Sequence, residues 1–175
     1  MKLALFLLTD LLLGYVPQAA GCAVCLFMFV KESLRTRKFL ITTCFYSMVA
    51  VVIRLAYNWK LIDFGFHTVV IWAIFVLIAI AYNRYPVVQS TFSILVSGVL
   101  ITVSELITAG ILVLIYGEKN FTNMMNNTET LDGKLVKALC GVPTNILFLI
   151  IVLVAYFVAR RRWKKNSEAT QNVTQ

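Results

Sequence analysis

Residues 87–116 read VVQSTFSILVSGVLITVSELITAGILVLIY, a run of thirty residues with one charged side chain, Glu105. At 1.5 Å per residue, a helix of this length is longer than the ~30 Å hydrocarbon core of a bilayer. Apolar stretches also occupy residues 3–30, 39–57, 66–82 and 138–159. The sequence therefore predicts an all-α membrane protein, a polytopic bundle of five transmembrane helices.

The overall composition leads to the same class. The chain of 175 residues is 60% hydrophobic, and its mean hydropathy of +0.84 is well above that of soluble domains. Residues 1–165 are predicted to form one transmembrane domain, whose connections leave no room for a catalytic domain. Residues 166–175 are polar and lack aromatic residues, which predicts a disordered cytoplasmic tail.

Positive charge sets the expected orientation. Ten of the sixteen Lys and Arg residues lie in the segments 31–38, 83–86 and 160–165, which alternate to one side. Cytoplasmic loops carry such an excess, so the N-terminus is predicted outside and the C-terminus in the cytoplasm of a multi-pass cell-membrane protein. Six residues represent the cytoplasmic clusters: Arg35, Arg37, Lys38, Arg160, Arg161 and Arg162.

The net charge of +8 does not indicate nucleic acid as a partner. The basic residues lie at helix ends and do not form one face, so their expected partner is the lipid bilayer with its anionic headgroups.

Four ionisable residues lie within the predicted spans, namely Asp10, Arg54, His67 and Glu105. The expected topology places all of them in the outer half of the membrane, where charges usually face a bundle interior. One interpretation is a buried pair of Arg54 with Glu105 or Asp10 that fixes helix register. The other is a polar pocket that opens outward and takes a small molecule or peptide.

Two prolines lie inside predicted spans. Pro17 and Pro143 each remove a backbone hydrogen bond, which predicts a kink that can act as a hinge. The fourth span also carries small residues suited to close packing: Ser93, Ser97, Gly98, Ala109 and Gly110. The connection 117–137 is polar and is expected to be the one long outer loop.

Metal, cofactor and enzyme chemistry have no support in the motifs. Cys22 and Cys25 form a CxxC inside an apolar stretch, without a second pair, and Cys44 and Cys140 lie in other spans. All four are predicted to be buried small residues. HExxH, GxSxG and P-loop patterns are absent from the sequence. The segment ending at Ala19-Ala20-Gly21-Cys22 also resembles a lipoprotein signal, but hydrophobicity continues to Val30. We therefore expect a retained span, and cleavage is the alternative.

The order of short motifs resembles the transmembrane sensor region of bacterial histidine kinases of the accessory-gene-regulator and sporulation type, over about residues 10–165. The motifs are Val16-Pro17-Gln18, Gly65-Phe66-His67-Thr68, Ser104-Glu105-Leu106 and Leu139-Cys140-Gly141-Val142-Pro143, followed by a basic cluster. The kinase domain of that two-component family has no counterpart before Gln175. The resemblance therefore implies a sensor-like or regulatory module, or a fragment, without kinase activity of its own.

Such a module would work through a cytoplasmic or membrane signalling partner, or as a homodimer. Two alternatives stay open. The chain could be the substrate-binding membrane component of a vitamin-type transporter, although such subunits usually have six spans. It could also be a structural membrane protein without a ligand. Vitamin binding would favour the transporter, and altered output of a partner kinase would favour the sensor.

Overall fold

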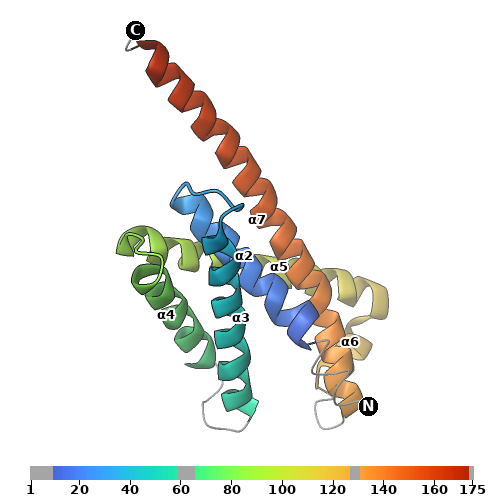
Figure 1. Cartoon of the computed structure of the whole chain (residues 1–175). Helices are drawn as coiled ribbons and strands as arrows, with labels where there is room; N and C mark the ends of the chain where they lie inside the picture. The colour runs from blue at the N-terminus through green and yellow to red at the C-terminus, as the bar shows by residue number, and fades with distance from the viewer. Residues whose placement is uncertain (1–9, 59–65, 127–130, 174–175) are drawn as a thin grey trace.

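The computed structural model describes residues 10–58, 66–126 and 131–173, and every regular element in these ranges is helical (Figure 1). The elements follow in the order η1 (Asp10–Tyr15, a π-helix), α2 (Val16–Phe29), α3 (Arg37–Asn58), α4 (Phe66–Ala81), α5 (Val87–Tyr116), α6 (Glu118–Asn126) and α7 (Leu131–Val173). The predicted stretches 39–57, 66–82 and 87–116 agree with α3, α4 and α5 to within two residues. The all-helical class is therefore confirmed.

Two helices in the described ranges, 87–116 in α5 and 135–163 in α7, are long and apolar enough to cross a membrane. Only 22% of the most apolar 18 residues of α5, and 17% of those of α7, are buried against the rest of the chain. Large apolar side chains point outward instead, with Leu106 69% and Leu114 87% exposed. A core helix of a soluble protein would bury this surface, so the pattern indicates membrane association. Five spans and their orientation stay a prediction.

The buried face of α5 is small and polar, the inverse of a soluble helix. It consists of Ser90, Ser93, Ile94, Ser97, Gly98, Ile101, Ser104 and Thr108. Ser97 Oγ donates to the Ser93 carbonyl and Ser104 Oγ to the Leu100 carbonyl, both at 2.8 Å, so these hydroxyls are satisfied within the helix. Small residues let neighbouring helices approach closely, as expected for packing in lipid.

At Gly98, α4 approaches α5 closely, because a Cβ there would lie 2.5 Å from Cη2 of Trp72. Gly110 does not belong to this packing face, contrary to the prediction. It is exposed, and a Cβ built there meets no atom within 4 Å.

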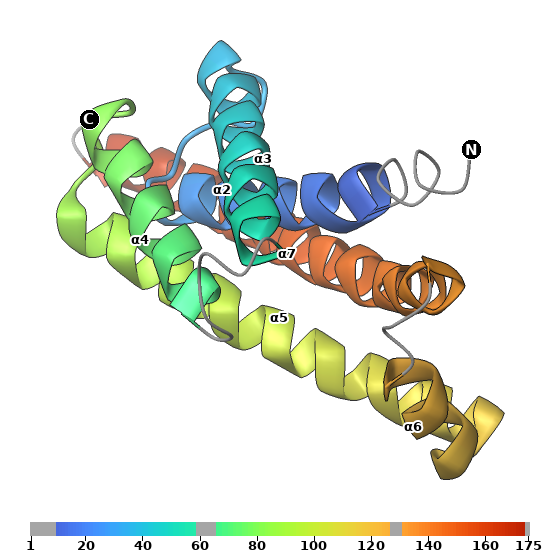
Figure 2. The same cartoon turned by 90° about the horizontal axis from the view of Figure 1, so that it is seen from below.

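The core of the bundle is α2, which packs against α3, α5 and α7. Figures 1 and 2 show α2 between α3 and α7. Cys22, Cys25 and Phe27 are at most 2% exposed, which confirms the predicted burial of these two cysteines. The prediction was wrong for Cys44, which is exposed, and Cys140 is half-buried. Cys25 Sγ donates to the Ser93 carbonyl at 3.4 Å and so joins α2 to α5.

The helical geometry changes directly before Pro17, where the π-helix η1 gives way to α2. Proline has no N–H to donate to the carbonyl four residues earlier, which is that of Leu13. The side-chain amide of Asn145 in α7 donates to this carbonyl at 3.4 Å. The polar residue on α7 thus compensates for the bond that Pro17 removes.

The C-terminal third is more helical than predicted. The connection 117–137 contains α6 and the start of α7, instead of being a loop throughout. The backbone of α7 continues unbroken through Pro143 and extends the helix to Val173, into the tail predicted to be disordered. Once a helix has formed, each further residue adds one hydrogen bond, so extension into a polar segment costs little.

Candidate functional site

Of the four ionisable residues predicted within the spans, the structure describes the side chains of two, His67 and Glu105. Asp10 and Arg54 lie on η1 and α3, but their side chains are outside the described part. His67, near the start of α4, is buried at 8% exposure, and its Nε2 lies 3.3 Å from Thr68 Oγ1. The predicted pairing of Arg54 with an acid therefore stays a prediction.

Glu105 differs from the expected inward orientation. Ser104 and Thr108 occupy the face that α5 turns toward the other helices, and the next residue along points about 100° away. Glu105 is accordingly exposed, and it makes no ion pair with another described residue. Pro143 is exposed too, whereas Thr144 beside it is buried.

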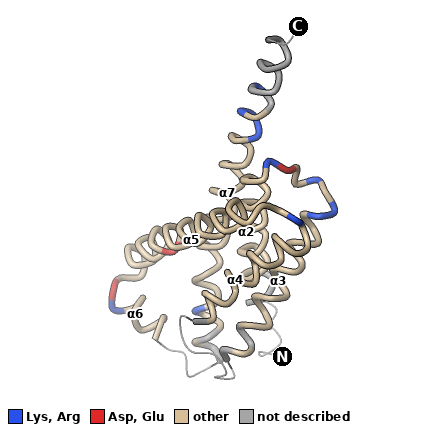
Figure 3. Tube along the Cα trace, turned by 90° about the vertical axis from the view of Figure 1, so that its left-hand side faces the viewer, with Lys and Arg blue, Asp and Glu red and all other residues tan. Residues whose placement is uncertain are grey.

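A polar network lies instead at the opposite, basic end of the molecule. Figure 3 shows that Lys and Arg residues of the α2–α3 connection and of the C-terminal part of α7 gather at this end. In the connection, the Glu32 carboxylate accepts a short hydrogen bond from the Tyr85 hydroxyl, and Lys38 Nζ lies 3.5 Å from its other oxygen. Burial, together with the bond to Glu32, raises the pKa of Tyr85.

Tyr156 fixes the α2–α3 connection to α7. This side chain is fully buried, and its hydroxyl donates to the Glu32 carbonyl at 3.1 Å and accepts from the Leu34 N–H at 3.3 Å. Tyr156 lies within an apolar stretch, where hydropathy does not distinguish it from its neighbours. A tyrosine one turn before the Arg160 cluster is the only signal that could have indicated it.

A second set of contacts holds the α4–α5 turn at this end. Asn83 Nδ2 donates to Thr42 Oγ1 of α3 at 2.9 Å, and both side chains are buried. Because Tyr85 of the same turn donates to Glu32, the two connections and α7 form one assembly. Three segments distant in sequence, residues 32–42, 83–85 and 156, are thus joined at the basic end.

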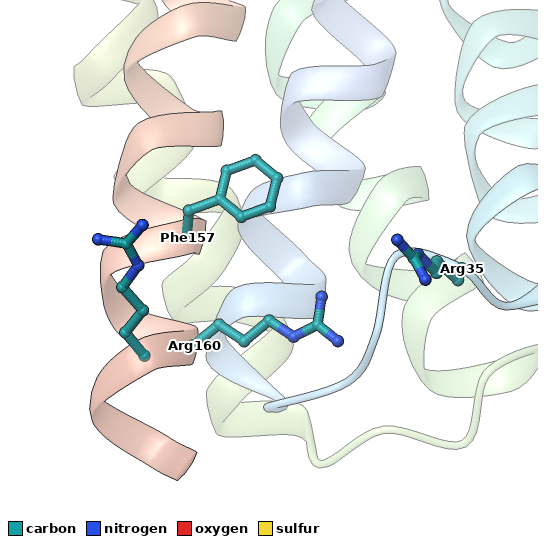
Figure 4. A pocket seen from close by; sticks show the side chains of 4 residues that line it. Arg35, Phe157 and Arg160 are labelled. Carbon is teal, nitrogen blue, oxygen red and sulfur yellow. The ribbon is translucent and has the colours of Figure 1, made fainter. Parts of the chain in front are cut away.

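Next to this assembly is an open pocket of about 360 Å³ (Figure 4). It is lined by Arg35 from the connection and by Phe157, Arg160 and Arg161 from α7. Arg160 extends from α7 toward the connection that carries Arg35. The structure therefore brings together three of the six predicted cytoplasmic basic residues. Arg37, Lys38 and Arg162 do not line the pocket.

Comparison with family models, with curated proteins and with solved structures found no match for this chain.

Proposed function

We propose that the chain is a five-span regulatory module of the cell membrane, with its C-terminus in the cytoplasm, that passes a signal along α7. The observation that carries this proposal is the continuity of α7 over 43 residues, from Leu131 to Val173. At 1.5 Å per residue it is about 65 Å long, roughly twice the hydrocarbon thickness. A continuous helix of this length can carry a rotation or shift from the outer end of the bundle to the cytoplasm.

The basic end supports the proposed orientation and the output role. Positive charge gathers where α7 leaves the bundle, as expected for a cytoplasmic surface. Tyr156 links α7 to residues 32–34 there, so movement of α7 would be transmitted to the connection between α2 and α3. The input would be a small molecule or peptide that reaches the bundle from outside.

One observation favours a purely structural role as the second candidate. The buried hydroxyls of Ser97 and Ser104 are satisfied within α5, as they would be in a helix that only packs. Glu105, expected to line a ligand pocket, is exposed. The vitamin-type transporter has no comparable observation in its favour.

The experiment uses residues 1–165 in place of the membrane region of an accessory-gene-regulator-type histidine kinase with a transcriptional reporter. One to four residues are then inserted at the junction after Lys165. Each inserted helical residue rotates the kinase helix by about 100°. If α7 is a rigid output element, reporter activity should vary with a period near 3.6 residues, so the four-residue insertion should resemble the parent.

The matched control moves the same insertions to the turn after Arg84, which is not part of α7 and is exposed. These should change output without helical periodicity. Equal output for all four insertions at Lys165 would contradict the proposal and favour the structural role.

A further inference from the structure

Three arginines from two segments line one pocket. Arg35, Arg160 and Arg161 make no ion pair with any carboxylate that the structure describes. The acid nearest to Arg35 along the chain, Glu32, is already engaged by Lys38 and Tyr85. Cations that line one pocket repel one another, so an anion bound there would offset part of that repulsion.

The backbone that carries these residues is held in place before any ligand arrives. Arg35 directly follows Leu34, whose N–H donates to the buried Tyr156 hydroxyl. The Arg35 N–H itself donates to Ser33 Oγ at 3.4 Å. Arg160 lies one turn after Tyr156 on the same helix, so one tyrosine sets the spacing between the two segments. Such preorganisation lowers the cost of binding.

The geometry of the charges indicates the ligand chemistry. A guanidinium offers a planar fork of N–H donors that matches two oxygens of a phosphate. The pocket has three arginines in its lining, and its volume of about 360 Å³ is enough for a phosphate with a small substituent. A carboxylate has only two oxygens and would leave some of the N–H donors without an acceptor, so the pocket suits a phosphate better.

The fourth lining residue distinguishes a lipid from a soluble anion. Phe157 is 54% exposed and lies at the pocket, and outward-facing Ile150 and Val154 continue the apolar surface along α7. The pocket is thus charged on one side and continuous with an apolar helix face on the other. This arrangement matches an amphiphilic ligand whose charged group lies among the headgroups and whose apolar part lies among the acyl chains.

We propose that this pocket binds the headgroup phosphate of an anionic phospholipid, with the acyl chain along the Phe157 face of α7. The proposal requires the chain to lie in a membrane, but it does not require signalling. Binding there would bridge the α2–α3 connection and α7 and would stabilise their contact.

The test measures immobilisation of spin-labelled phosphatidylglycerol, relative to phosphatidylcholine, by the full chain in phosphatidylcholine nanodiscs. The pocket variant is Arg35→Gln with Arg160→Gln. The control is Arg37→Gln with Arg162→Gln, which removes the same charge two residues further along the chain in each case, but not from the pocket. We expect the pocket variant to lose about tenfold in relative affinity, as for lost charge-assisted hydrogen bonds, and the control to stay within about twofold.

Two further variants separate the contributions. Arg160→Lys keeps the charge but not the fork, and should lose part of the selectivity. Phe157→Ala keeps all charges and should weaken lipid immobilisation a fewfold. Melting temperatures in detergent identify any variant that misfolds, and Arg160→Lys then serves in place of the glutamine variant.

Three results would overturn the proposal. Equal losses in the control variant would mean diffuse surface charge. Displacement of the labelled lipid by millimolar inorganic phosphate or glycerol phosphate would mean a soluble anion site. Equal immobilisation of both lipids by the unmodified chain would mean that the pocket does not select anionic headgroups.

Discussion

At the scale of single residues, close approach of helices depends on the absence of a side chain. Gly21 of α2 faces Phe148 of α7, and a Cβ built on it would collide with the phenyl ring. Phe148 is fully buried, so its ring has little room to move away. The close approach of α2 and α7 at this point therefore requires a residue without a side chain at position 21.

We predict that Gly21→Ala lowers the free energy of unfolding in detergent by about 1–3 kcal/mol, because overpacking forces the two helices apart. Gly110→Ala is the control, since a Cβ there meets nothing within 4 Å and alanine favours the helix. Thermal unfolding followed by circular dichroism measures both. Combining Gly21→Ala with Phe148→Leu should recover part of the loss, and a strictly additive double variant would contradict the assigned contact.

At the scale of elements, the distribution of polar and apolar side chains around α5 indicates which surroundings the helix is suited to. It buries serines and exposes Leu95, Val99 and Leu106, so its apolar surface points away from the chain. In water this arrangement would leave a large unfavourable surface, whereas in lipid it has no such cost. The exposed face of α5 is therefore predicted to contact acyl chains.

Val99→Lys tests this placement, because residue 99 is 64% exposed near the middle of α5. A lysine at the centre of a span costs about 2.5–3.5 kcal/mol on insertion scales, so the membrane-inserted fraction should fall. Val88→Lys, also exposed but in the first turn of α5, should insert almost normally. Protease protection of membrane vesicles measures the inserted fraction. Normal insertion of both variants would mean that α5 does not face lipid.

At the scale of the whole molecule, the charges divide the bundle into two ends. The basic end holds the assembly of Glu32, Tyr85 and Tyr156, and the other end holds α6 and the start of α7. α7 connects the two ends, which makes it the element whose displacement would affect both.

We predict that reporter fusions after Lys165 and after Asn123 report opposite sides of the membrane. The physical reason is that the larger share of basic residues stays in the cytoplasm while the α5–α7 connection is translocated. Alkaline phosphatase and green fluorescent protein fused at each point give the readout, because they are active on opposite sides. The same side for both points would mean that the last predicted span does not cross the membrane, which would contradict the five-span topology.

The sequence alone determined the helices that depend on local composition. The stretches 39–57, 66–82 and 87–116 could be placed because an apolar run bounded by charged or turn residues suffices to define a helix that lipid can surround. The burial of Cys22 and Cys25 also followed from their apolar surroundings.

Only the tertiary structure decided which face of each helix points inward and which distant segments meet. Glu105 was expected to face inward, but the packing of Ser104 and Thr108 turns it outward, and hydropathy carries no information on that rotation. The contact of Tyr156 with residues 32–34, more than 120 positions away, likewise depends on how α2 and α7 pack. A run of apolar residues is enough to predict a helix, because the backbone hydrogen bonds of a helix are local. Side chains that meet across helices are fixed by packing, which no local pattern encodes.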